Sequence, residues 1–290
     1  MKMVIDSNAL QSIGLRDHLS ADKANVAVVP DFIFVEAYKS KSVAAVCKSM
    51  EILCEFPRQV IVLKPTKKCS GLVGREAGLQ RRLIHQKQTS QFSSYARILR
   101  RACDGDNSAI RSIEADFAAP TAHMDGLAQE AVGLGDRIDH FVSNFSKEDR
   151  AAIRADHLPS EQAIRHAMKQ ILKTTYDVMK THPNVYQCPK AHELINTFVF
   201  RASLCQVVLA MHLGSQGSQA KTSIKHHVNH QMDAFIAAYA TYFDGVHSND
   251  AQLIRTFRTA SIWIEALRRS GQRQGEIVEV VHGWQRSDPV

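Results

Sequence analysis

The sequence predicts an α/β protein with a central parallel sheet flanked by helices. Three short apolar runs near the amino terminus, each closed by an aspartate or a proline, alternate with stretches of helical periodicity. The same alternation returns near residue 225, after a long stretch without a convincing strand. With 290 residues and 44% apolar content, the chain can bury a sizeable core. We therefore expect one sheet that is interrupted in the sequence and completed near the carboxyl end.

The first 65 residues are expected to form βαβ units, with strands at residues 3–5, 25–30 and 59–65. The first strand ends at Asp6, and the other two end in proline. Asp31 is expected to cap a helix that carries Glu36 in its second turn. Further helices are expected over residues 9–19 and 43–56.

Residues 66–224 are expected to form a large all-helical insertion in this α/β core. The expected helices cover residues 78–88, 94–103, 107–117, 127–145, 147–156, 160–180 and 191–213. Ser146 and Ser160 look like helix starts, and residues 214–219 look like a flexible joint. Polar residues interrupt the apolar stretch 197–213, which predicts a buried helix instead of a membrane span.

The α/β pattern resumes with a helix over residues 222–242 that carries Asp233 near its middle. A short strand beginning at Gly245 follows and ends in a polar turn that contains Asp250. Another helix covers the apolar positions from 253 to 267, and residues 276–281 are expected to form a final edge strand. Residues 1–65 and 225–290 together would form the core, with residues 66–224 inserted between the third strand and the Asp233 helix.

Positive charge is concentrated in one part of the chain. The net charge is +7, and residues 66–103 carry nine lysines and arginines against the single acid Glu76. Segregated positive charge favours a polyanionic partner such as nucleic acid, whereas the simpler interpretation is a solvated basic surface. The candidate nucleic-acid-binding residues are Arg75, Arg81, Arg82, Arg97, Arg100 and Arg101.

The six cysteines contain no C-x-x-C pair, which argues against a zinc ribbon and against a disulfide-stapled secreted domain. Asp6 interrupts the segment where a signal peptide would have its apolar centre. The sequence therefore predicts a cytoplasmic protein with reduced thiols and no membrane partner.

Four carboxylates occupy related positions: Asp6 after the first strand, Glu36 after the second, Asp233 on the resumed helix, and Asp250 after the fourth strand. Parallel strands bring these positions to one edge of the sheet. Acids gathered there repel one another unless a cation neutralises them, so Mg²⁺ or Mn²⁺ is the expected cofactor. A metal of this kind promotes phosphodiester hydrolysis.

These residues carry a resemblance to a known family. The opening Ile5-Asp6-Ser7-Asn8, the Glu36 segment, the run Asp233-Ala234-Phe235-Ile236-Ala237-Ala238 and the turn Ser248-Asn249-Asp250 resemble the PIN domain of metal-dependent nucleases. The resemblance implies that Asp6, Glu36, Asp233 and Asp250 are the catalytic and metal-binding acids. It also implies that Ser7, Asn8, Ser248 and Asn249 support these acids or face a phosphate. The departure is the insertion, because a typical PIN domain has only a short helical connection there.

The resemblance implies a divalent-metal-dependent endoribonuclease, with a role as a toxin or defence effector and with an inhibitor or regulatory protein as a partner. RNA is favoured over DNA, because many members of the family are toxin ribonucleases. A structure-specific DNA nuclease and a non-catalytic PIN-like binding module remain alternatives, and a homo-oligomer remains open. His226 and His230 also share a helix face at a spacing that zinc sites use, but without an H-E-x-x-H pattern we expect an ordinary polar face.

Overall fold

The computed structural model describes residues 1–117, 126, 128–129 and 131–271. Its sheet consists of four parallel strands in the order β3-β2-β1-β4. The strands are β1 (Lys2–Ile5), β2 (Val26–Val29), β3 (Val60–Val62) and β4 (Gly245–His247). The α/β class and the return of the sheet near the carboxyl end are thus confirmed. The predicted edge strand 276–281 lies outside the described residues.

The strands are apolar on both faces because helices cover both faces. Ile5, Ala27 and Val29 point into one buried cluster, whereas Val4 and Val28 point into another. This alternation follows from the two-residue period of a strand. The register places Val4 beside Val28 on one side and beside Val246 on the other, so β1 is an interior strand.

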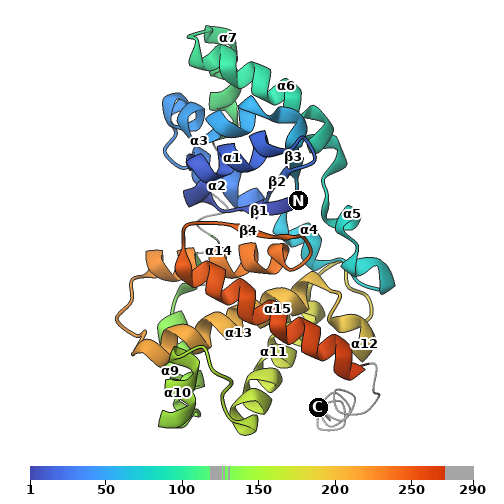
Figure 1. The fold of residues 1–290 in the computed structure, drawn as a ribbon, viewed down its shortest axis with the longest axis vertical. Coiled ribbons are helices and arrows are strands. Elements are labelled where there is room, and N and C mark those ends of the chain that lie inside the picture. Colours follow the sequence, from blue (N-terminus) through green and yellow to red (C-terminus); the bar gives the residue numbers. More distant parts are fainter. Residues whose placement is uncertain (118–125, 127, 130, 272–290) are drawn as a thin grey trace.

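The amino-terminal helices cover the first face (Figure 1). They are α1 (Ile13–Ala21), α3 (Val43–Glu55), α6 (Gln86–Cys103) and α7 (Asn107–Glu114). A disulfide joins Cys47 of α3 to Cys103 of α6. The prediction of reduced thiols is therefore wrong for this pair, because two cysteines 56 positions apart in the sequence are brought together by helix packing that no local motif announces.

The second face is covered by the later helices, which form a thick layer in the lower half of Figure 1. They are α9 (Leu134–Ser143), α10 (Lys147–Arg154), α11 (Glu161–Thr181), α13 (Phe198–Gln216), α14 (Ile224–Ala240) and α15 (Ala251–Gly271). The capping box at Ser146 and the cap at Ser160 confirm the two predicted helix starts. Among the described residues, α13 alone is long and apolar enough to cross a membrane, and 83% of its apolar stretch is buried inside the protein.

Shorter elements connect these layers. They are η1 (Ser7–Ala9), α2 (Asp31–Tyr38), η2 (Pro57–Gln59), α4 (Thr66–Ser70), η3 (Arg75–Gly78), α5 (Gln80–Leu83), η4 (Ala115–Phe117) and α12 (Ala191–Leu194). The single helix predicted over 191–213 is therefore two helices, because Thr197 caps α13. The predicted joint 214–219 is partly wrong, since α13 continues to Gln216.

Residues 66–224 share their core with the sheet. One buried cluster contains Val4 and Val28 together with Phe198 of α13 and Ala234 of α14. Within it, the fully buried Arg201 donates hydrogen bonds to the carbonyl oxygens of Ile195 and Thr241. The long helical stretch is thus packed onto both faces of the sheet, with α6 and α7 on the first face and α13 on the second.

Candidate active site

The candidate site begins at the carboxyl end of β1. Asp6 follows the last residue of this interior strand and is only 4% exposed. Its Oδ1 accepts a hydrogen bond from the Ser7 amide at 2.6 Å. Asp6 also caps the short helix η1, which turns the chain away from the sheet. The apolar strand and the polar turn after it therefore fix a buried carboxylate at the sheet edge.

The turn after β4 meets this carboxylate. Ser248 Oγ donates to Asp6 Oδ2 at 2.6 Å and accepts from the amide of Asp250 at 2.9 Å. Beside it, Asn8 Oδ1 accepts from the amide of Asn249 at 3.0 Å. The structure thus brings together Asp6, Asn8, Ser248 and Asn249, all of which the sequence singled out, from two strands that lie side by side.

Asp250 is held by the helix that it starts. Its Oδ1 accepts from the amides of Gln252 at 2.7 Å and Leu253 at 2.9 Å, at the beginning of α15. An acid at this position also interacts favourably with the helix dipole. Both bonds use the same carboxylate oxygen, so the other oxygen of Asp250 retains acceptor capacity.

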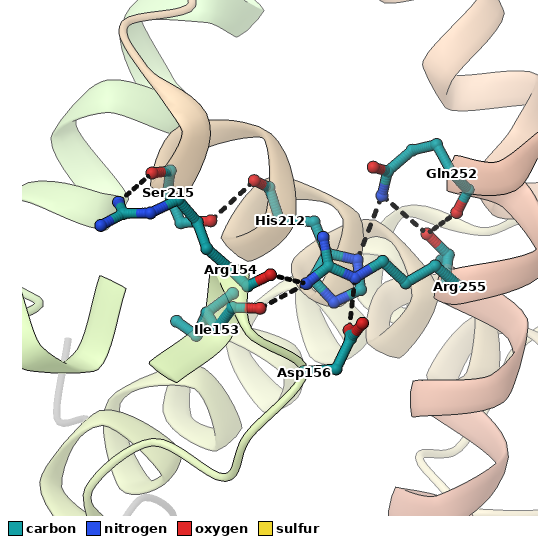
Figure 2. A network of polar contacts seen from close by, with 8 residues as sticks. Ile153, Arg154, Asp156, His212, Ser215, Gln252 and Arg255 are labelled. Carbon is teal, nitrogen blue, oxygen red and sulfur yellow. Dashed lines mark hydrogen bonds and ion pairs between the residues drawn. The ribbon is translucent and has the colours of Figure 1, made fainter. Parts of the chain in front are cut away.

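The start of α15 is anchored in turn on α10 and α13 (Figure 2). Gln252 Nε2 lies 3.1 Å from Nδ1 of His212, and Arg255 reaches Asp156 and the carbonyl oxygens of Ile153 and Arg154. Burial lowers the pKa of His212 to about 4, so the imidazole is neutral at pH 7. Its Nδ1 can therefore accept a hydrogen bond from the side-chain amide of Gln252. This network fixes the helix on which Asp250 depends.

Asp233 and Glu36 interact through their charges with the other acids. Burial is the main cause that raises the pKa of Asp233, and the charges of Asp250 and Glu36 raise it further. Burial also raises the pKa of Asp6, to which Asp233 and Asp250 add. Charge interactions thus connect Asp6 with Asp233 and Asp250, and Asp233 with Glu36.

Two basic side chains that the sequence did not assign accompany these acids. Lys39 forms an ion pair with Glu36, and Nδ1 of His230 lies 3.9 Å from Asp233 Oδ2, too far for a hydrogen bond. Each partner stands three residues from its acid along a helix, a spacing that brings side chains onto one face. This spacing was the signal in the sequence that would have found them.

The nearby aspartates have other roles. Asp31 does not cap α2, contrary to the prediction; Pro30 precedes the helix, and the Asp31 carboxylate accepts from the amide and hydroxyl of Thr66 instead. Asp244 accepts from the amide of Lys2, at the end of the sheet where the strands begin. It therefore lies at the opposite edge from Asp6.

The donor set suits a hard divalent cation in charge and chemistry. Carboxylate oxygens are the ligands that Mg²⁺ and Mn²⁺ prefer. A cation would offset the burial and the weaker mutual repulsion that raise the pKa values of Asp6 and Asp233. The spacing is less favourable. Within the described part of the chain, no three His, Cys, Asp or Glu residues are grouped closely enough to hold a metal ion. Binding would require these side chains to approach one another.

The comparisons with known proteins add no relative. No protein-family model, curated protein or solved structure that was compared with this chain matches it. The candidate site is therefore argued from its own geometry.

The candidate nucleic-acid-binding arginines do not gather beside the acids. The α5 helix begins at Gln80 and carries Arg81 and Arg82. The side chain of Gln80 contacts Lys2 at the start of β1 and the carbonyl of Tyr242. This helix lies beside the amino terminus in Figure 1, at the edge of the sheet where β1 begins.

The remaining candidates are held in local contacts. Arg97 donates to Ser94, Arg100 to the carbonyl oxygen of Cys54, and Arg101 pairs with Asp106. Arg75 begins η3. The order of charges along the sequence did not reveal this, because the chain reverses direction between β3 and α6, where Ile84 pairs antiparallel with Leu63.

Proposed function

We propose that this chain is a divalent-cation-dependent endoribonuclease with a PIN-like core. The observation that carries the proposal is the junction of β1 and β4, where Ser248 links Asp6 to the turn that holds Asp250. The charges of Asp250 and Glu36 that act on Asp233, and those of Asp233 and Asp250 that act on Asp6, support the proposal. The strand order and the parallel sheet are compatible with such a core. In this proposal, residues 66–224 are an elaboration of it.

Asp6, Glu36, Asp233 and Asp250 would hold Mg²⁺ or Mn²⁺. Bound there, the cation would supply an activated water and charge stabilisation for the leaving oxygen of a phosphodiester. The chain's own residues orient the ligands: Ser248 fixes one oxygen of Asp6, the Ser7 amide fixes the other, and α15 fixes Asp250. Asn8 and Asn249 close the turn beside them.

The test is divalent-dependent cleavage of a labelled RNA oligonucleotide by the full chain. Asp6→Asn and Asp233→Asn should each remove cleavage while the far-ultraviolet circular dichroism stays that of the wild type. Asp244→Asn is the matched control, because it neutralises an aspartate at the opposite edge, and it should cleave normally.

Full activity in both Asp6→Asn and Asp233→Asn would refute the mechanism. A matched DNA oligonucleotide in the same assay distinguishes the ribonuclease from a structure-specific DNA nuclease. Calorimetric titration with Mn²⁺ provides a separate readout: the wild type should bind the ion, and Asp6→Asn should bind it at least tenfold more weakly. A chain that neither binds Mn²⁺ nor cleaves would instead be a non-catalytic binding module.

A further inference from the structure

A cavity of about 710 Å³ opens into the helical layer next to the acidic edge. Four helices line it: α9, α11, α13 and α14 (lower half of Figure 1). Its volume lies within the usual range of sites for small organic ligands. One lining residue, His230, also lies beside Asp233, so the cavity and the candidate active site share a wall on α14.

The cavity contains polar atoms that the protein leaves unsatisfied. In the described part of the chain, five buried side-chain nitrogen or oxygen atoms have no hydrogen-bond partner. Three of them belong to residues that line this cavity: His166 Nε2, His230 Nδ1 and Gln231 Oε1. An unsatisfied buried polar group is costly to a fold, and such groups are rare in native proteins. Their concentration in one cavity points to a ligand that supplies the missing partners.

Aromatic rings form part of the cavity lining. The rings of Phe141 and His166 are stacked, with centroids 5.1 Å apart and planes 17° from parallel. Phe145 packs edge-on against both rings and fixes their orientation. Aliphatic side chains such as Ile138, Val207 and Leu213 supply the remaining apolar surface. A planar, apolar-faced ligand with polar edges matches this arrangement.

We propose that this cavity binds a nucleobase. The side-chain oxygen of Gln231 requires a donor on the ligand, and Nε2 of His166 accepts or donates according to tautomer. Nδ1 of His230 faces Asp233 instead and is not assigned to the ligand. A purine or pyrimidine carries both kinds of group in its plane and presents a face for aromatic contact. The chain's net charge of +7 favours a ligand attached to phosphate.

The base has two sources, a free nucleoside or nucleotide and an unpaired base of a strand whose backbone lies at the acidic edge. The proposal that the cavity binds a base depends only on the geometry of the cavity. Only the second source rests on the proposed ribonuclease function, because it needs a strand at the neighbouring acids.

The experiment is isothermal titration of the full chain with adenosine, guanosine, cytidine and uridine, in the absence of divalent cations. At least one nucleoside should bind saturably, and one should bind more tightly than the others. His166→Phe keeps an aromatic ring but loses the nitrogens, and Gln231→Met keeps the length but loses the acceptor. Each should weaken binding about tenfold, as expected for one lost hydrogen bond in a buried site.

His192→Phe is the matched control, because it makes the same exchange at a histidine with a 67% exposed side chain outside the cavity. It should bind like the wild type. The proposal is overturned if no nucleoside binds saturably, or if His166→Phe and Gln231→Met bind as tightly as His192→Phe. Circular dichroism confirms that each variant is folded before it is titrated.

Two further measurements distinguish the two sources of the base, and distinguish base binding from the proposed ribonuclease activity. If the base belongs to a strand, the preferred nucleoside should inhibit RNA cleavage competitively, and His166→Phe should raise the KM without an equal fall in kcat. If the ligand is free, the nucleoside should bind without competing with the oligonucleotide. Nucleoside binding should survive in Asp6→Asn, so its loss and the loss of cleavage report on different proposals.

Discussion

Replacing Ser248 by alanine should destabilise the fold in a pH-dependent way. The hydroxyl donates to the buried Asp6 carboxylate at 2.6 Å and accepts from the Asp250 amide at 2.9 Å. Losing the bond to the ionised carboxylate costs about 2 kcal/mol, and leaving the amide without a partner costs about 1 kcal/mol. The Ser248→Ala variant should therefore lose about 3 kcal/mol of unfolding free energy at pH 8.

The pH dependence follows from Asp6. Its pKa is already raised above the ordinary 3.8 by burial, and the Ser248 hydrogen bond counteracts this rise. Removing the bond raises the folded-state pKa of Asp6 further. The loss of unfolding free energy in Ser248→Ala therefore grows as pH rises through the folded-state pKa of Asp6 in the wild type, where the carboxyl ionises. Once the Asp6 carboxyl is protonated, the bond joins two neutral groups and contributes only about 1 kcal/mol. The loss at pH 4 should therefore be smaller than at pH 8 and approach about 2 kcal/mol.

Guanidinium chloride unfolding at pH 4 and pH 8, followed by circular dichroism, measures both values. Ser261→Ala is the control, because its hydroxyl donates only to the carbonyl oxygen of Phe257 on its own helix. That variant should lose less than about 0.5 kcal/mol at both pH values. A loss in Ser248→Ala that is equal at the two pH values, or no larger than in Ser261→Ala, would refute the coupling of the two strand ends.

Three further predictions use the same unfolding assay. Asp233→Asn should stabilise the protein at pH 8, because the folded-state pKa of Asp233 is raised and its ionised form is therefore destabilising from about pH 3.8 upward. This gain in unfolding free energy should shrink toward pH 4. A gain that does not depend on pH would contradict the prediction. Cys47→Ala should lower the unfolding free energy by about 4 kcal/mol under oxidising conditions, since the bond to Cys103 closes a loop of about 56 residues, and a reductant should cancel the difference. Arg201→Met should cost about 3 kcal/mol by leaving two backbone carbonyls unpaired, and a neutral outcome would mean that water replaces the guanidinium.

Much of the fold was predictable because its signals are local. Short apolar runs, the first closed by Asp6 and the next two by proline, located the first three strands, and the caps at Ser146 and Ser160 located two helix starts. The acidic edge was predictable in part because position in a parallel sheet follows from chain order. The pKa shifts of Asp6 and Asp233 are consistent with that placement.

The features that the sequence did not predict depend on long-range packing. The pairing of Cys47 with Cys103 requires α3 and α6 to lie together, and no spacing rule encodes that. The position of α5 depends on a reversal of the chain after β3, and the positions of charged residues in the sequence do not indicate this reversal. The cavity beside His230 arises only where four helices meet, so its polar atoms look ordinary until their surroundings are known.

The interior position of β1 has a consequence for the order of synthesis. Its second neighbour, β4, is made about 240 residues later, and the contact between Ser248 and Asp6 spans 242 positions of the chain. During translation β1 therefore keeps one unpaired edge until the ribosome has passed residue 247, and Asp6 has no partner turn until then. For the proposed nuclease, this order keeps an unfinished chain inactive while it is still attached to the RNA that encodes it.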